Sequence, residues 1–122
     1  ADKTLADAFS KSLAVEGVTV KVERLKAQDV PAVINVAEFA RRFGEMNAFY
    51  GMEGADADRD MTLVLNAANP VVQAFPSLDE EKKTFVAKQV YYLAKLSYKK
   101  LSPDEMKDFS ANSVQLLGKF VG

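Results

Sequence analysis

Residues 77–121 read SLDEEKKTFVAKQVYYLAKLSYKKLSPDEMKDFSANSVQLLGKFV, and this stretch decides the fold. Its apolar spacing predicts one helix over about 78–98 and a second that begins at Pro103 and reaches nearly to Phe120. Helices of similar length joined by a few residues form an antiparallel hairpin. Both helix starts follow from capping boxes, in which a serine and a glutamate three residues later satisfy free backbone amides: Ser77 with Glu80, and Ser102 with Glu105.

Each helix of this hairpin carries more apolar residues than one face can hold, whereas a surface helix needs a single stripe about 100° wide. Two stripes imply burial on two sides, and an exposed second stripe is typical of an interface. A larger core covering both sides is the alternative, but 122 residues provide little else to cover them. The pattern therefore favours self-association. The residues predicted for the dimer interface are Val86, Val90, Leu93, Leu96, Phe109, Ser113, Leu116, Leu117 and Phe120.

Residues 1–76 are predicted to form a small β-sheet with flanking helices. The first helix over 2–13 places apolar residues four apart, and residues 18–23 alternate between valine and polar residues as a half-buried strand does. A short buried strand is expected around 33–36, and Asn69 followed by Pro70 is typical of a helix start. Together with a third strand at Thr62–Asn66, these elements predict one α+β domain over 1–122, with an α/β part at 1–76 and a dimerisation hairpin at 77–122.

An amphipathic helix is predicted over about 37–50, with aromatic and methionine side chains along one side. Spacing alone favours packing into the core, but such side chains also suit adaptable contacts with other proteins. Only two cationic residues flank the helix, so binding to a membrane surface has little support. The residues assigned to protein contact are Met46, Phe49, Tyr50 and Met52.

The acidic stretch 51–60 imitates the start of a calcium loop. Met61 stands where the turn of such a loop needs glycine, and Ala67 stands where a bidentate glutamate belongs. The stretch is therefore predicted to be a solvated loop, and no metal site is expected.

Composition excludes several classes of protein. The 16 basic residues nearly balance the 17 acids, which argues against a nucleic-acid partner. No apolar run is long enough to cross a membrane, and the absence of cysteine makes a cytoplasmic location the default expectation. Without histidine or cysteine there is no conventional nucleophile pair or zinc site, and no phosphate-binding loop motif is present. Neither catalytic nor cofactor-binding residues are assigned.

Several segments resemble a known family in order and spacing. Thr62-Leu63-Val64-Leu65-Asn66 followed by Asn69-Pro70-Val71-Val72-Gln73 looks like its strand-then-helix signature. Gln89–Ser97 together with Leu101-Ser102-Pro103-Asp104-Glu105-Met106 looks like its next element, and Val30-Pro31-Ala32, Ala40-Arg41-Arg42 and Glu45-Met46 also match. The chain thus resembles the C-terminal dimerisation domains of the bacterial HtpG branch of the heat shock protein 90 chaperones. Asn112 departs from the family, which often carries a basic residue there.

This resemblance implies a V-shaped homodimer in which two hairpins form a four-helix bundle. ATP and magnesium would act in the N-terminal and middle domains of a longer parent protein, so this chain itself would be no enzyme. The helix at 37–50 would contact non-native client proteins. Two alternatives are an unrelated dimeric adaptor and a stand-alone enzyme that uses Tyr91, Tyr92 and Lys95. ATP turnover by the chain would support the enzyme.

Overall fold

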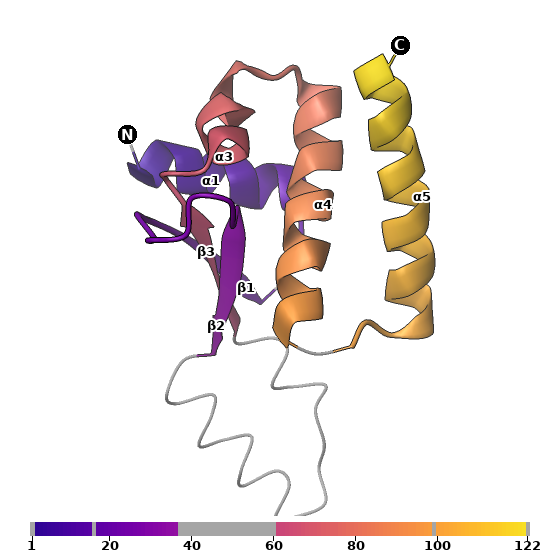
Figure 1. The fold of residues 1–122 in the computed structure, drawn as a ribbon, viewed down its shortest axis with the longest axis horizontal. Coiled ribbons are helices and arrows are strands. Elements are labelled where there is room, and N and C mark those ends of the chain that lie inside the picture. Colours follow the sequence, from indigo (N-terminus) through magenta and orange to yellow (C-terminus); the bar gives the residue numbers. More distant parts are fainter. Residues whose placement is uncertain (1, 16, 37–60, 99, 122) are drawn as a thin grey trace, which may run out of the picture.

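The computed structural model describes residues 2–15, 17–36, 61–98 and 100–121. Within these residues the chain has the predicted α+β fold, with a small sheet, helices packed on it and a C-terminal helical hairpin. Figure 1 shows the arrangement in layers: the sheet, then α4 (Glu80–Tyr98), then α5 (Pro103–Val121) on the far side of α4. In this part of the chain the last helix therefore packs mainly against α4 and has a wide free surface.

The sheet has the order β1-β3-β2, in which β1 (Val18–Glu23) runs parallel to β3 (Met61–Asn66) and β2 (Ala32–Val36) runs antiparallel to it. Val20 and Ile34 both stand opposite Leu63, so the apolar residues of all three strands share one face. The predicted alternation of β1 is confirmed, because its valines are half-buried and the residues between them exposed. β2 lies at the sheet edge, which leaves Val33 and Ile34 half-buried rather than fully buried as predicted.

Two helices cover the apolar face of the sheet. α1 (Asp2–Leu13) packs against β1, α4 packs against β2, and the two helices contact each other. The short helix α3 (Pro70–Ala74) and the 3₁₀ turn η2 (Phe75–Ser77) lead from β3 into α4. The centre of the core consists of the following buried residues: Phe9, Leu13, Met61, Leu63, Leu65, Val72, Phe75, Ala87, Val90, Tyr91 and Ala94.

The helix starts follow local hydrogen bonding. Asn69 caps α3 by accepting the Val71 amide at 2.9 Å, and Pro70 follows it, as predicted. The Ser102 box at the start of α5 is also confirmed, because the Glu105 amide donates to Ser102 Oγ and the Ser102 amide donates to Glu105 Oε1. The capping box predicted at Ser77 and Glu80 is wrong.

Ser77 lies in the 3₁₀ turn instead, and α4 starts at Glu80 rather than at residue 78. Leu78 is extended, so the chain enters the helix two residues later than the Ser77 pattern implies. Asp79 provides the cap, because its carboxylate accepts the Lys82 amide at 2.8 Å.

A buried asparagine at the end of β3 holds the connection between β1 and β2. The Asn66 side chain is fully buried and makes four hydrogen bonds of 2.8–3.0 Å. Its oxygen accepts the amides of Leu25 and Ala68, and its nitrogen donates to the carbonyls of Ala27 and Val30. We call these four bonds the Asn66 clamp. It satisfies backbone groups in a loop that has no ladder of its own.

Candidate self-association surface

The two helices of the hairpin are joined by hydrogen bonds rather than by apolar packing alone. Asn112 of α5 is buried, and its Nδ2 donates to the Phe85 carbonyl at 2.8 Å and to Gln89 Oε1 at 3.2 Å. Ser113 Oγ bonds the same Gln89 oxygen at 3.0 Å. The sequence left the role of Asn112 open, and the structure places it at the centre of the contact between α4 and α5.

Charged and aromatic groups continue this contact toward the loop of the hairpin. Tyr92 Oη donates to the Asp108 carboxylate at 2.6 Å. Lys95 is buried, forms an ion pair with Glu105 and lies 5.4 Å from the centre of the Tyr91 ring. We call the set formed by these contacts and those of Asn112 the polar seam.

The contacts of the polar seam shift the pKa values of Tyr92 and Glu105. Burial raises the pKa of Tyr92 far above its ordinary value, and the hydrogen bond and negative charge of Asp108 raise it further. For Glu105, partial burial acts upward but is outweighed by the hydrogen bonds from Lys95 and from the Ser102 amide. The pKa of Glu105 is therefore held below its usual range, which means that the folded state favours the carboxylate.

We expect stability to fall in acid because of Glu105. Its folded pKa lies below the value of about 4.3 in an unfolded chain, so its contribution is present above that pH and is lost as pH falls through the folded pKa. Replacing Glu105 with glutamine should cost about 1.5–3 kcal/mol at pH 7, the usual worth of a hydrogen bond to a charged group. Urea unfolding from pH 7 to pH 3 measures both effects.

The control for this prediction is Asp104→Asn, which removes an exposed acid from the same first turn of α5. It should keep the acid-dependent loss of stability, whereas Glu105→Gln should reduce it. Equal pH profiles for the two variants would contradict the role given to Glu105.

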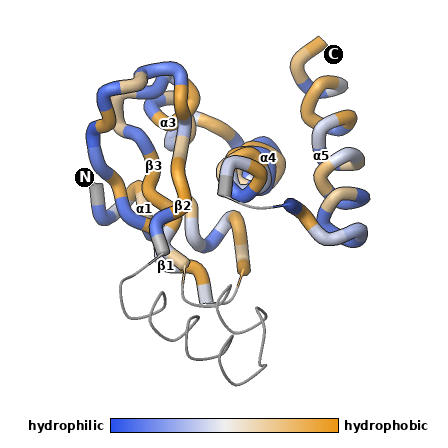
Figure 2. Tube along the Cα trace, turned by 60° about the horizontal axis from the view of Figure 1, so that its bottom comes forward, coloured by the Kyte–Doolittle hydropathy of each residue, from blue (hydrophilic) through white to orange (hydrophobic). Residues whose placement is uncertain are grey.

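Apolar side chains of α5 on and next to the side turned away from α4 are uncovered in the single chain. Leu117 is 62% exposed, Val114 69%, Val121 81% and Phe120 88%. We call these four residues the outer face of α5. Figure 2 shows α5 standing apart beyond α4, with apolar segments along it up to its C-terminal turn. Single exposed apolar residues are ordinary, but a cluster of them on one helix is typical of an interface.

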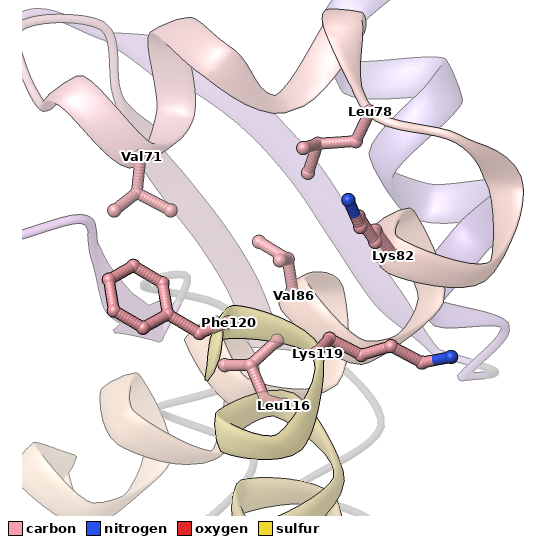
Figure 3. A pocket seen from close by; sticks show the side chains of 7 residues that line it. All are labelled: Val71, Leu78, Lys82, Val86, Leu116, Lys119 and Phe120. Atoms are coloured by element: carbon pink, nitrogen blue, oxygen red, sulfur yellow. The ribbon is translucent and has the colours of Figure 1, made fainter. Parts of the chain in front are cut away.

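A groove extends the outer face onto α4. It has a volume of about 420 Å³ and is lined by side chains from both helices and from the segment before α4. Figure 3 shows Phe120 and Leu116 of α5 beside Val86 of α4. The remaining lining residues are Val71, Leu78, Lys82 and Lys119.

The predicted interface residues separate into three groups. Leu93, Leu96, Leu117 and Phe120 are exposed. Val86, Phe109, Ser113 and Leu116 are half-buried between or beside the helices. Val90 is buried in the core beneath the sheet, so in the single chain it is not available to a partner.

Part of the apolar surface was not among the predicted interface residues. Met106, Val114 and Val121 are exposed on α5, and Val71 is exposed on α3. Val114 and Val121 lie seven residues apart, on one side of a helix, and with Leu117 they form the second apolar stripe that the spacing predicts on α5. Val71 could not have been found by spacing, because only the packing of α3 brings it beside Phe120 at the groove.

The residues predicted to contact client proteins, Met46, Phe49, Tyr50 and Met52, lie outside the described residues, as do the whole 37–50 segment and the acidic stretch up to Asp60. In the part of the chain that the structure describes, no three acidic side chains gather as a metal site would need. No helix in that part has the length and apolar character needed to span a bilayer.

In comparisons with known proteins, the chain matches no family model and none of the curated proteins. What the residues themselves define is an α+β domain whose C-terminal hairpin is joined by a polar seam and presents an uncovered apolar face.

Proposed function

We propose that this chain is a homodimerisation domain, and that two copies associate through the outer face of α5 and the neighbouring side of α4. The observation that carries the proposal is the exposure of Val114, Leu117, Phe120 and Val121 on one helix. Leaving four such side chains in water forfeits roughly 1.5–3 kcal/mol for each, so covering them with a second copy is strongly favoured.

The shape of the hairpin suits a symmetric partner. Val86 and Leu93 are two turns apart on one side of α4, and the groove places Val86 beside Leu116 and Phe120 of α5. The apolar surface therefore spans both helices on one side of the hairpin. Two hairpins that pack these sides together form a four-helix bundle with the same patch contributed by each copy.

The resemblance to bacterial HtpG domains supports a more specific role. We propose that the domain belongs to an ATP-dependent chaperone of the heat shock protein 90 family, acts in the cytoplasm, and holds two ATPase arms together. ATP and magnesium would be bound by other domains of the parent protein, and client proteins would contact the 37–50 segment. An unrelated dimeric adaptor would share the hairpin but would not affect chaperone activity when deleted from its parent.

The test of the proposal is the solution mass of the chain. At tens of micromolar, light scattering should give twice the mass of one chain, and dilution should shift the mass toward the monomer. A monomer at that concentration would refute the dimer. A mass that rises only when another protein is added would favour the adaptor.

A further inference from the structure

The side of α5 that packs against α4 carries several charged and polar residues, although α5 has apolar residues elsewhere. The side turned toward α4 carries Glu105, Asp108 and Asn112 beside the half-buried Phe109 and Leu116, whereas the side turned away carries Val114, Leu117 and Val121. Both sides therefore offer apolar residues, and apolar burial alone would not exclude a rotation with Val114 and Leu117 packed against α4. Some other interaction must therefore fix the rotation of α5 about its own axis.

We infer that the polar seam sets this rotation, and that Gln89 and Asn112 thereby keep the outer face available to a second copy. The inference rests on the proposed function and deepens it, because it names the residues that decide which surface a partner meets.

Geometry supports this role for Gln89 and Asn112. Asn112 Nδ2 reaches the Phe85 carbonyl and Gln89 Oε1 together, and both distances depend on the angular position of Asn112. At 100° per residue, Asn112 and Leu117 lie nearly on opposite sides of α5, about 140° apart. Turning Leu117 toward α4 would carry Asn112 away from both acceptors.

The rest of the seam opposes the same rotation. Tyr92 bonds Asp108, and the buried Lys95 pairs with Glu105, at positions one and two turns from Asn112. Rotation would separate each pair and leave polar groups without these partners in a partly buried contact, which is costly. Buried polar contacts are known to fix register in helical assemblies in this way.

The experiment uses the double variant Gln89→Ala with Asn112→Ala. Alanine removes the hydrogen bonds, keeps helix propensity high and adds no apolar side chain that would reward the original rotation. The chain has no cysteine, so spin labels on cysteines placed at Glu81 and Lys119 occupy unique sites. These two residues pair across the hairpin in the native rotation, and both are partly exposed. Mixing with excess unlabelled chain leaves one labelled copy in each dimer.

We expect the distance between labels to lengthen by roughly 10 Å, about the width of a helix with its side chains. The dissociation constant of the dimer should rise at least roughly tenfold, because the outer face is turned inward. The matched control, Thr84→Ala with Gln115→Ala, changes one exposed polar residue on each helix outside the seam and should alter neither quantity.

An unchanged label distance in the Gln89/Asn112 variant would overturn the inference, whatever the dissociation constant. If that variant loses its helical signal, Asn112→Ala alone takes its place. A longer label distance then supports the inference, and an unchanged distance overturns it. A wild-type chain that is monomeric would refute the proposed function, while the label distance would still decide whether the seam sets the rotation. If the wild type is a dimer and the Gln89/Asn112 variant shows no change in label distance, only the role given to the polar seam is refuted.

Discussion

Replacing Leu117 with aspartate is expected to give a folded monomer. Leu117 is largely exposed in the single chain, so the substitution disturbs no core contact. In the proposed dimer it would place an unpaired charge in an apolar contact, at a cost of about 3–5 kcal/mol for each copy. Since 1.4 kcal/mol corresponds to a factor of ten, the dissociation constant should rise at least about a hundredfold. Sedimentation over a dilution series measures it.

The matched control is Gln115→Asp, which adds the same charge to the same turn of α5 at an exposed polar position. Both variants place a negative charge near the C-terminal end of a helix, so the unfavourable effect of the helix dipole is shared. The control should remain dimeric, and both variants should keep their helical signal. If Leu117→Asp stays dimeric, the interface does not include the outer face.

Replacing Asn66 with alanine is expected to destabilise the domain by about 3–5 kcal/mol, which is exceptional for a single substitution. The change removes all four bonds of the Asn66 clamp and leaves the amides of Leu25 and Ala68 without that acceptor in a partly buried site. Each unsatisfied buried group costs about 1–3 kcal/mol. Urea unfolding followed by circular dichroism measures the loss.

Two further variants test the reason for that loss. Gln73→Ala removes an amide side chain that bonds the Ala67 carbonyl at an exposed position, so it should cost less than about 0.5 kcal/mol. Asn66→Asp keeps both accepted bonds but directs a carboxylate at the carbonyls of Ala27 and Val30. Its pKa should be raised in the folded state, so this variant should be less destabilised at pH 4 than at pH 7. If Asn66→Ala lowers the free energy of unfolding no more than Gln73→Ala does, the Asn66 clamp is unimportant for stability.

Much of the fold could be predicted from the sequence because its signals are local. The Ser102 box, the Asn69 cap and the alternation of β1 each involve hydrogen bonds or side-chain directions within a few residues. The same locality explains the error at Ser77. Asp79 is also a good cap two residues further on, and the 3₁₀ turn through Phe75 decides which of the two is used.

The candidate interface was only partly predictable from the sequence. The spacing in α4 and α5 indicated more apolar surface than a single face can hold, which led to Leu93, Leu117 and Phe120. Spacing could not decide that Val90 faces the core, because Val86, Val90 and Leu93 fall within one broad stripe of α4. That choice depends on where the sheet lies.

The sequence by itself determined the α+β class, the helical hairpin and the excess of apolar residues on it, because periodicity and capping act along the chain. The tertiary structure alone decided which of those residues are covered. The Asn66 clamp joins residues about forty positions apart, and Asn112 meets Phe85 and Gln89 only when the hairpin closes. Such contacts leave no periodic signal, since their energy depends on where two distant segments pack. For the same reason, only the packed hairpin reveals that Asn112 is turned inward while Val114 and Leu117 stay exposed.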